Sequence, residues 1–393
     1  MKNAQSYLAV LLVFFVMGFC DIVGISSDYM QMTFHLSPFL TGLIPSLVFI
    51  WFLFLGIPVG NLMDVFGRKN TVLLGLVVTV VGMALPMLFY NLTAFVAAFI
   101  FIGIGNAILQ VSLNPLLMNI VGNSKMLTSS LTMGQVIKAV SSFLGPEIIL
   151  IATSIWGTEN WHYCFLILGG ITILSALLLI LSPIKKETVN AADNRISMKN
   201  SLSLLKNKNM LILFLGIFFV VGVDVSTNFL SSKLMMVKFG WALEEAKIAP
   251  QIYFLSRTVG ALLGSFLLMR LNDIKFFKVN IIAAVLSLLL WYFIQDETFN
   301  LICIGGVGFF ASSVFSIIYS VALRLSPDKT NVVSGLMITA VAGGALITPL
   351  IGIVASVADF SAGIWVTVVC TLYLTYCAFA AKHMLTPATK EAE

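Results

Sequence analysis

The chain has 393 residues, of which 59% are hydrophobic and only 10% are charged, with a formal net charge of +5. Soluble domains carry about a quarter charged residues, and no soluble core of this length could bury so much apolar surface. The composition therefore excludes an ordinary soluble protein and indicates a chain whose main solvent is lipid.

Continuous apolar runs follow one another from the N-terminus onward. A helix needs about 20 apolar residues to cross a bilayer, whereas the strands of a membrane barrel would alternate apolar and polar residues. We therefore predict an all-α membrane protein with twelve transmembrane helices, over 6–30, 39–62, 71–90, 94–121, 127–154, 162–182, 210–235, 248–270, 277–294, 299–323, 332–357 and 361–382. One long polar stretch, 183–209, separates the first six helices from the last six.

Lysine and arginine residues are distributed unevenly between the predicted loops. With the N-terminus inside, 17 of the 22 basic residues fall on the cytoplasmic side and 3 outside, while Lys138 and Arg257 lie within spans. Because cytoplasmic loops are enriched in Lys and Arg, this bias predicts that both termini are cytoplasmic. The short loops favour a bacterial inner membrane as the location.

The loop between the second and third predicted spans carries a motif. It reads Gly60-Asn61-Leu62-Met63-Asp64-Val65-Phe66-Gly67-Arg68-Lys69 and is similar to the G-x-L-x-D-x-x-G-R-K signature of the major facilitator superfamily. The resemblance implies two six-helix bundles, 1–182 and 210–393, joined by the cytoplasmic linker 183–209 and moving around a central site. It also implies that Gly60, Asp64, Gly67 and Arg68 gate the cytoplasmic side, with Asp64 near Asn331 at the start of the eleventh span.

Further segments resemble the fucose–galactose–glucose:proton symporter family within that superfamily. They are Asn114-Pro115 in the fourth span, 218–225 in the seventh, 256–260 in the eighth, and 314–320 and 343–349 in the tenth and eleventh. This resemblance implies a secondary active transporter that imports a sugar or sugar derivative, neutral or acidic, by proton-coupled alternating access.

Charged and amide side chains within the spans are the candidates for the substrate site, because a charge at bilayer depth is costly and is kept where it faces a partner or a ligand. Asp21 matches a coupling aspartate of the family, and Asp224 is the second candidate for the proton. Rings such as Tyr253 and Tyr319 could stack on a sugar or simply fill the core. The predicted substrate-binding residues are Asp21, Gln110, Asn114, Gln135, Lys138, Asp224, Asn228 and Arg257.

Two positions depart from the family pattern. Gln110 stands where the family has a protonatable glutamate, so uncoupled facilitation and sodium coupling stay open. Lys138 stands where the family often has asparagine, and it shares a helix face with Gln135, three residues earlier. Its ammonium group could form an ion pair with Asp21 or Asp224, or it could receive a carboxylate or sulfate of the substrate.

Rival functions follow from weaker features. Gly145-Pro146 resembles part of an antiporter motif, which leaves a proton-coupled exporter of small amphipathic compounds as an alternative. The sequence has no phosphate-binding G-x-x-x-x-G-K-[ST] loop, no catalytic constellation and no metal-ligand pattern among its cysteines and histidines. We therefore expect neither enzyme activity, cofactor nor nucleic-acid partner, but a monomer in the lipid bilayer that binds a small-molecule substrate and protons.

Overall fold

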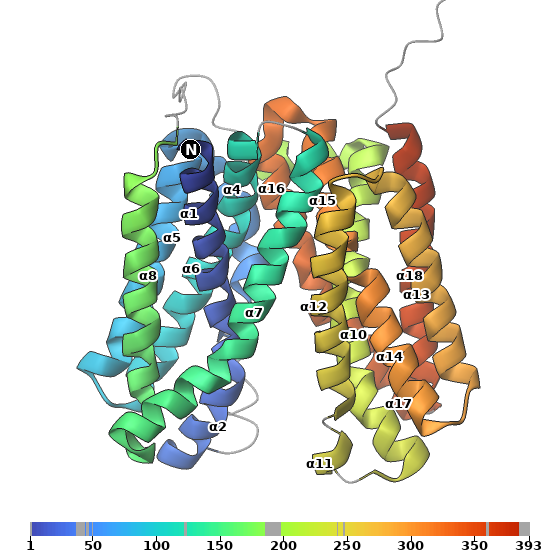
Figure 1. The fold of residues 1–393 in the computed structure, drawn as a ribbon, viewed down its shortest axis with the longest axis horizontal. Helices are drawn as coiled ribbons and strands as arrows, with labels where there is room; N and C mark the ends of the chain where they lie inside the picture. Colours follow the sequence, from blue (N-terminus) through green and yellow to red (C-terminus); the bar gives the residue numbers. More distant parts are fainter. Residues whose placement is uncertain are drawn as a thin grey trace, which may run out of the picture. The chain divides into compact units, whose positions relative to one another are not determined.

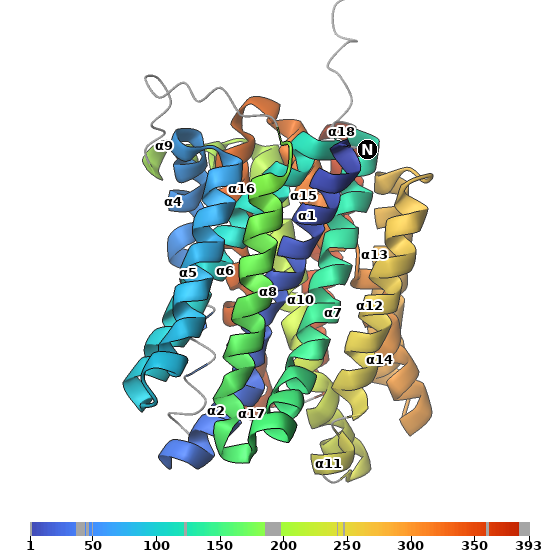
Figure 2. The same ribbon diagram turned by 60° about the vertical axis from the view of Figure 1, so that its left-hand side comes forward.

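The computed structural model describes residues 2–36, 44, 47–48, 50–121, 124–184, 198–241, 243–246, 248–358 and 361–384. Throughout these residues the regular structure is helical (Figures 1 and 2). In this part of the chain, eleven helices are long and apolar enough to cross a membrane, and Trp51–Phe66 is a shorter apolar helix. The predicted all-α membrane fold is confirmed, and the helix count is consistent with twelve spans. Much of 39–50, the start of the predicted second span, lies outside the described residues.

The first half of the chain forms the helices that the apolar runs predict. Gly67 separates α4 from α5 with a backbone φ of 79°, a conformation that glycine adopts without strain. The elements are α1 (Lys2–Met17), η1 (Gly18–Ile22), α2 (Val23–Phe34), α4 (Trp51–Phe66), α5 (Arg68–Leu88), α6 (Leu92–Val121), α7 (Ser124–Trp156), η2 (Thr158–Tyr163) and α8 (Cys164–Leu181).

The second half begins with two short elements that belong to the predicted linker. They are α9 (Met198–Ser203) and η3 (Leu204–Lys206). The helices that follow are α10 (Lys208–Phe239), α11 (Leu243–Ala246), α12 (Ile248–Leu268), α13 (Asp273–Phe293), α14 (Glu297–Ala311), α15 (Val314–Leu325), η4 (Pro327–Lys329), α16 (Thr330–Thr339), η5 (Ala340–Ala342), α17 (Gly343–Val357) and α18 (Ala362–Met384).

Contacts along the chain divide it into two compact units. Unit 1 comprises Met1–Asn123, Gly134–Ser201 and Thr330–Thr339, whereas unit 2 comprises Ser124–Met133, Leu202–Lys329 and Ala340–Glu393. The first turns of α7 therefore pack with unit 2, and α16 packs with unit 1. The division into bundles at 1–182 and 210–393 stays a prediction.

In unit 1, α5 packs against α6 and α8, and α4 packs against α16. The crossing of α4 and α16 depends on small residues, because the backbones approach closely. A Cβ atom added to Gly335 would lie 2.4 Å from the Gly56 carbonyl oxygen, and one added to Gly60 would lie 2.8 Å from the Asn331 oxygen. Gly56 and Gly60 form a Gly-x-x-x-Gly pair, the pattern that lets membrane helices meet without intervening side chains.

In unit 2, α10 contacts α12, α15, α17 and α18, while α14 lies against α12 and α13. Here too, glycines allow backbone contact. A Cβ atom added to Gly308 of α14 would lie 2.6 Å from the Tyr253 oxygen of α12, and one added to Gly260 of α12 would lie 2.4 Å from the Phe309 oxygen of α14. These reciprocal contacts fix the part of α12 that carries Tyr253 and Arg257.

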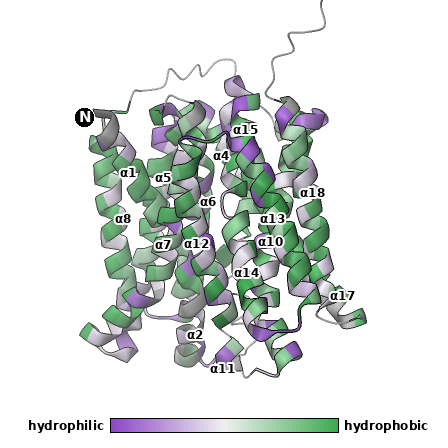
Figure 3. Ribbon diagram, turned by 45° about the vertical axis from the view of Figure 1, so that its right-hand side comes forward, coloured by the Kyte–Doolittle hydropathy of each residue, from purple (hydrophilic) through white to green (hydrophobic). Residues whose placement is uncertain are grey.

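Hydrophobic residues cover the length of the helices, as Figure 3 shows. Many large apolar side chains point outward; Phe143 is 78% exposed and Val357 is 84% exposed. Exposed apolar surface on this scale is stable only against an apolar solvent, and the backbone polar groups are satisfied within the helices as a bilayer requires.

Several predicted spans contain a break in their α-helical geometry. The first span changes to a 3-10 segment at η1, and the eleventh does so at η5. In the tenth, α14 and α15 meet at Ser312 and Ser313. Such breaks in transmembrane helices often accompany binding sites, because they change the direction of backbone and side-chain polar groups. The break at η1 contains Asp21.

Candidate functional site

Asp21 lies half-buried in η1 and is hydrogen-bonded through both carboxylate oxygens. Its Oδ2 atom lies 2.5 Å from the Ser142 hydroxyl of α7, and its Oδ1 atom lies 3.3 Å from the Cys20 thiol. The Ser142 hydroxyl also lies 3.0 Å from the Lys138 carbonyl oxygen of its own helix. Both groups that donate to Asp21 are neutral, so the structure holds this carboxylate without a bound cation.

Gly18 allows the first span to approach α7 at this point. A Cβ atom added to Gly18 would lie 2.5 Å from the Lys138 carbonyl oxygen and 2.7 Å from the Ser141 Cβ atom. Because the nearest of these atoms belongs to the backbone, a larger residue would have to push the two helices apart. The glycine thus brings Asp21 within hydrogen-bond distance of Ser142.

Gln135 and Lys138 are both half-buried, and their spacing along α7 places them on one side of the helix with Ser142. The sequence left two roles open for Lys138, an ion pair with Asp21 or Asp224 and the binding of an anionic substrate group. In the described part of unit 1, the Lys138 ammonium group forms neither an ion pair with Asp21 nor a hydrogen bond. The ion pair with Asp21 is therefore not formed, and the partners of this carboxylate are Ser142 and Cys20.

A row of buried amides follows α6. Gln110 is 7% exposed and Asn114 is 2% exposed, and the Asn114 Nδ2 atom donates to the Gln110 carbonyl oxygen at 3.1 Å. Asn106, one turn before Gln110, is 3% exposed, and neither of its amide atoms has a hydrogen-bond partner. The Asn114 Oδ1 atom is also without a partner. Buried amides usually find partners, so this row has unused capacity to bind polar groups.

In unit 2, Asp224 of α10 forms an ion pair with Arg257 of α12 at 3.1 Å. The other carboxylate oxygen lies 2.5 Å from the hydroxyl of Tyr253, whose side chain is 1% exposed. Asn228, one turn after Asp224, is half-buried. Asp224 is thus held by a cation and a hydroxyl, whereas Asp21 is held by two neutral groups.

Tyr253 therefore acts as a hydrogen-bond partner of Asp224 rather than as a free stacking ring. Tyr319 is fully buried, and Phe315 is stacked on it with ring centroids 5.7 Å apart. Packing against neighbouring side chains accounts for the rings of Tyr319 and Phe315.

The motif around Gly60 to Lys69 contacts the start of α16 within unit 1. The Asn331 Nδ2 atom donates to Asp64 at 2.7 Å, and the Arg68 Nε atom donates to the Asn331 Oδ1 atom at 2.7 Å. Arg68 also donates to the Asn119 and Thr330 side chains. The neighbourhood expected for Asp64 is the one observed. We call Asp64, Arg68 and Asn331 the unit 1 latch.

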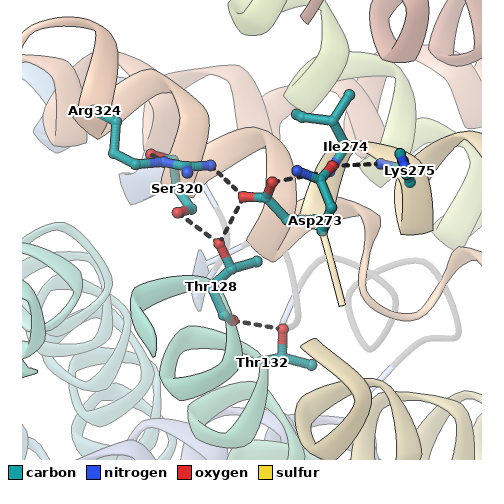
Figure 4. Close-up of polar contacts among 8 residues, drawn as sticks. Thr128, Thr132, Asp273, Ile274, Lys275, Ser320 and Arg324 are labelled. Atoms are coloured by element: carbon teal, nitrogen blue, oxygen red, sulfur yellow. Dashed lines mark hydrogen bonds and ion pairs between the residues drawn. The ribbon is translucent and has the colours of Figure 1, made fainter. Parts of the chain in front are cut away.

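A second polar cluster lies in unit 2, at the start of α7 (Figure 4). Arg324, at the end of α15, forms an ion pair with Asp273, at the start of α13. The Thr128 hydroxyl of α7 lies 3.3 Å from the same carboxylate and 2.8 Å from the Ser320 hydroxyl. We call these four residues the unit 2 latch. This cluster could not be anticipated from the sequence, because a threonine, an acid and an arginine far apart in the chain have no distinctive spacing.

The sequence model of the Major Facilitator Superfamily matches residues 7–349, most of the chain. The chain belongs to this superfamily. It is accordingly a multi-pass membrane protein, as the apolar helices also indicate. The motif that suggested the family supplies Asp64 and Arg68 of the unit 1 latch.

Known members of the superfamily are similar to this chain over nearly their full length. A glucose/galactose transporter of Brucella abortus is 26% identical over 388 residues, which cover 93% of this chain and 91% of the relative. The structure of a variant of the E. coli fucose:proton symporter FucP superposes with a TM-score of 0.84 at 19% identity, covering 97% of this chain and 99% of that one. The proton:xylose symporter XylE superposes with a TM-score of 0.75 at 14% identity, covering 96% and 95%. The two structures share the fold of this chain.

We expect the unit 2 latch to stabilise the packing of the first turns of α7 against the rest of unit 2. The side chains of Arg324 and Asp273 are only 18% and 15% exposed. Arg324→Met should therefore lower the free energy of unfolding by about 1–3 kcal/mol, since it leaves a largely buried carboxylate without its cation. Thermal unfolding of the purified protein would measure the loss. Combining Arg324→Met with Asp273→Asn should cost less than the sum of the two single variants; additive losses would show that the two groups do not interact.

Proposed function

We propose that this protein imports a sugar together with a proton by alternating access. The observation that carries the proposal is Asp21, an acid in a broken transmembrane helix whose donors, Ser142 and Cys20, are neutral. The names of similar proteins, a glucose/galactose transporter and two sugar:proton symporters, support the substrate class and the coupling ion. Gln110 has no proton to exchange, so the proposal assigns coupling to Asp21.

Asp224 was the second candidate for the proton, and its partners favour a different role. A carboxylate that pairs with an arginine is stabilised in its charged form, because protonation would give up the ion pair. In the described part of unit 1, Asp21 is hydrogen-bonded to Ser142 and Cys20 and forms no such ion pair. We therefore place proton coupling at Asp21, and substrate binding or gating at Asp224 and Arg257.

Amide side chains would bind the hydroxyl groups of the sugar. An amide offers two donors and an acceptor with two lone pairs, which suits a ligand whose hydroxyl groups both donate and accept. We assign this role to Gln110, Asn114, Gln135 and Asn228. Asn106 joins them, because both of its buried amide atoms lack partners.

The two latches would open and close the cytoplasmic side. The chain runs from α16 through η5 directly into α17. When the second half of the chain moves during transport, α16 is carried along and its contacts with Asp64 and Arg68 must break. The contacts of Thr128 with Asp273 and Ser320 would break with them, because α7 continues into the first half of the chain.

We further propose the setting that the sequence suggests. The distribution of basic residues supports an inner-membrane protein of a bacterium with both termini in the cytoplasm. A monomer that moves its substrate chemically unchanged, without a cofactor, agrees with the transporters to which the chain is similar.

Uptake into proteoliposomes would test the proposal. With an inward proton gradient, labelled galactose, glucose or fucose should accumulate, and a sodium gradient should have no effect. Sugar that only equilibrates, whatever the pH gradient, would indicate an uncoupled facilitator. Proton-driven efflux of amphipathic dyes without any sugar transport would favour the exporter instead.

A further inference from the structure

Lys138 carries a positive charge near the middle of the 33-residue helix α7, where a charge is expensive to maintain. Its side chain is half-buried. In the described part of unit 1, no acid pairs with its ammonium group and no carbonyl accepts from it. A cation in this position needs a compensating interaction, and the described residues of unit 1 do not supply one.

Other cations of the transmembrane helices have their compensation in the fold. Arg257 pairs with Asp224 at 3.1 Å, and Arg324 pairs with Asp273. The Lys278 ammonium group lies over the Phe379 ring, 4.3 Å from its centroid. Lys138 differs from these residues because its ammonium group has no partner within the described part of the fold.

Asp21 lies in the same neighbourhood as Lys138 without forming an ion pair with it. The Lys138 ammonium group and the Asp21 carboxylate both lie within electrostatic range of the Cys20 thiol. Yet the Asp21 oxygens bond to Ser142 and Cys20. The other candidate counter-ion, Asp224, has both oxygens engaged by Tyr253 and Arg257. Among the described residues, neither aspartate forms an ion pair with the lysine.

We propose that the Lys138 ammonium group binds the carboxylate of an acidic sugar, such as a uronic or aldonic acid, which deepens and rests on the proposed sugar transport. An ammonium group is a point charge with three donors, and it forms strong charge-assisted hydrogen bonds with a carboxylate. One lysine matches one negative charge; a sugar phosphate, with nearly two, would leave charge uncompensated beside Asp21. Gln135, one turn earlier on the same side of α7, is available to the sugar hydroxyls.

The assignment also connects the substrate to the proton. An anion bound at Lys138 lies near Asp21 and repels its charged form, so binding of the anion favours a protonated Asp21. Sugar acid and proton would then cross the membrane together without net charge movement. Neutral Asp21 can still accept from Ser142, so the carboxyl group stays in place when it takes up the proton.

Binding measured by calorimetry on the purified full-length protein would test the proposal, with galacturonate and gluconate compared with galactose and glucose at equal ionic strength. The wild type should prefer the acids by about tenfold or more, which corresponds to one hydrogen bond to a charged group. Lys138→Asn should lose this preference and Lys138→Arg should keep it. Lys278→Asn, which removes a cation elsewhere in the membrane, should behave as the wild type.

The possible results distinguish a failure of the acidic-sugar proposal from a failure of the sugar-transport proposal. If the wild type binds neutral hexoses and not the acids, the role of Lys138 is wrong while sugar transport stands. If galactose 6-phosphate binds more tightly than galacturonate, the carboxylate class is wrong. If no sugar of any kind binds a folded wild type, sugar transport itself is wrong. The preference of the wild type decides the matter even where Lys138→Asn does not fold.

Discussion

Asp21→Asn is expected to abolish accumulation of sugar while leaving sugar exchange intact. A gradient of one pH unit stores about 1.4 kcal/mol per proton, which can support about a tenfold accumulation. The variant cannot take up a proton at residue 21, so its internal sugar should only reach the external concentration. Asparagine keeps an oxygen that accepts from the Ser142 hydroxyl, so the contact between the first span and α7 should survive. Proteoliposome uptake at several pH gradients measures the first effect, and counterflow of labelled sugar measures the second.

Glu147→Gln is the matched control. It also replaces an acid by its amide, but the acid lies at an exposed position of α7. It should accumulate sugar as the wild type does. If Asp21→Asn accumulates sugar equally well, the proton is carried elsewhere and the assignment is wrong. If that variant loses counterflow as well as accumulation, Asp21 serves binding or folding rather than coupling.

The sequence predicted the helices and one set of contacts well. Apolar runs longer than a bilayer crossing leave helix as the only structure that satisfies their backbone, so the spans could be placed to within a few residues. The contact between Asp64 and Asn331 was also predictable, because a specific motif fixed one partner and a helix start fixed the other. Gly60, one of the glycines of the α4–α16 crossing, stood in the same motif.

The partners of the buried charges were less predictable. Ser142 bonds to Asp21, but Thr79 and Thr227 bond to carbonyl groups of their own helices. A hydroxyl in a membrane helix can do either, and the sequence does not distinguish the two. The choice depends on how closely two helices approach, and here it depends on the contact that Gly18 permits. The position of Ser142, one turn after Lys138, was the only signal in the sequence that this hydroxyl belongs to the site.

The same reason explains why the sequence alone left the partner of Lys138 open. An unpaired cation and two acids within the spans favoured an ion pair on electrostatic grounds alone. The structure gives each acid other partners, a hydroxyl and a thiol for Asp21, and an arginine and a tyrosine for Asp224. Tyr253, a stacking candidate by composition, lies one turn before Arg257 and shares its face, which indicates its role only once Asp224 is known to be there.

The pair of Asp224 and Arg257 should be essential for transport, beyond its contribution to stability. Arg257→Gln leaves the Asp224 charge without its cation at membrane depth. The two side chains are 26% and 38% exposed, so solvent screening should limit the loss of stability to about 1–2 kcal/mol, below the cost of breaking a fully buried pair. Counterflow should nevertheless fall to the background level, because the arginine is assigned to substrate binding or gating.

The double variant Asp224→Asn with Arg257→Gln separates the two contributions. Removing both charges leaves no unpaired ion, so thermal unfolding should return close to the wild-type value. Tyr253 can still donate to the amide oxygen at position 224, which preserves the packing of α10 on α12. Recovery of stability without recovery of counterflow would assign the charges themselves to transport. Recovery of both stability and counterflow would mean that the pair only holds the two helices together. Asn228 would then be the one proposed substrate-binding residue left in unit 2.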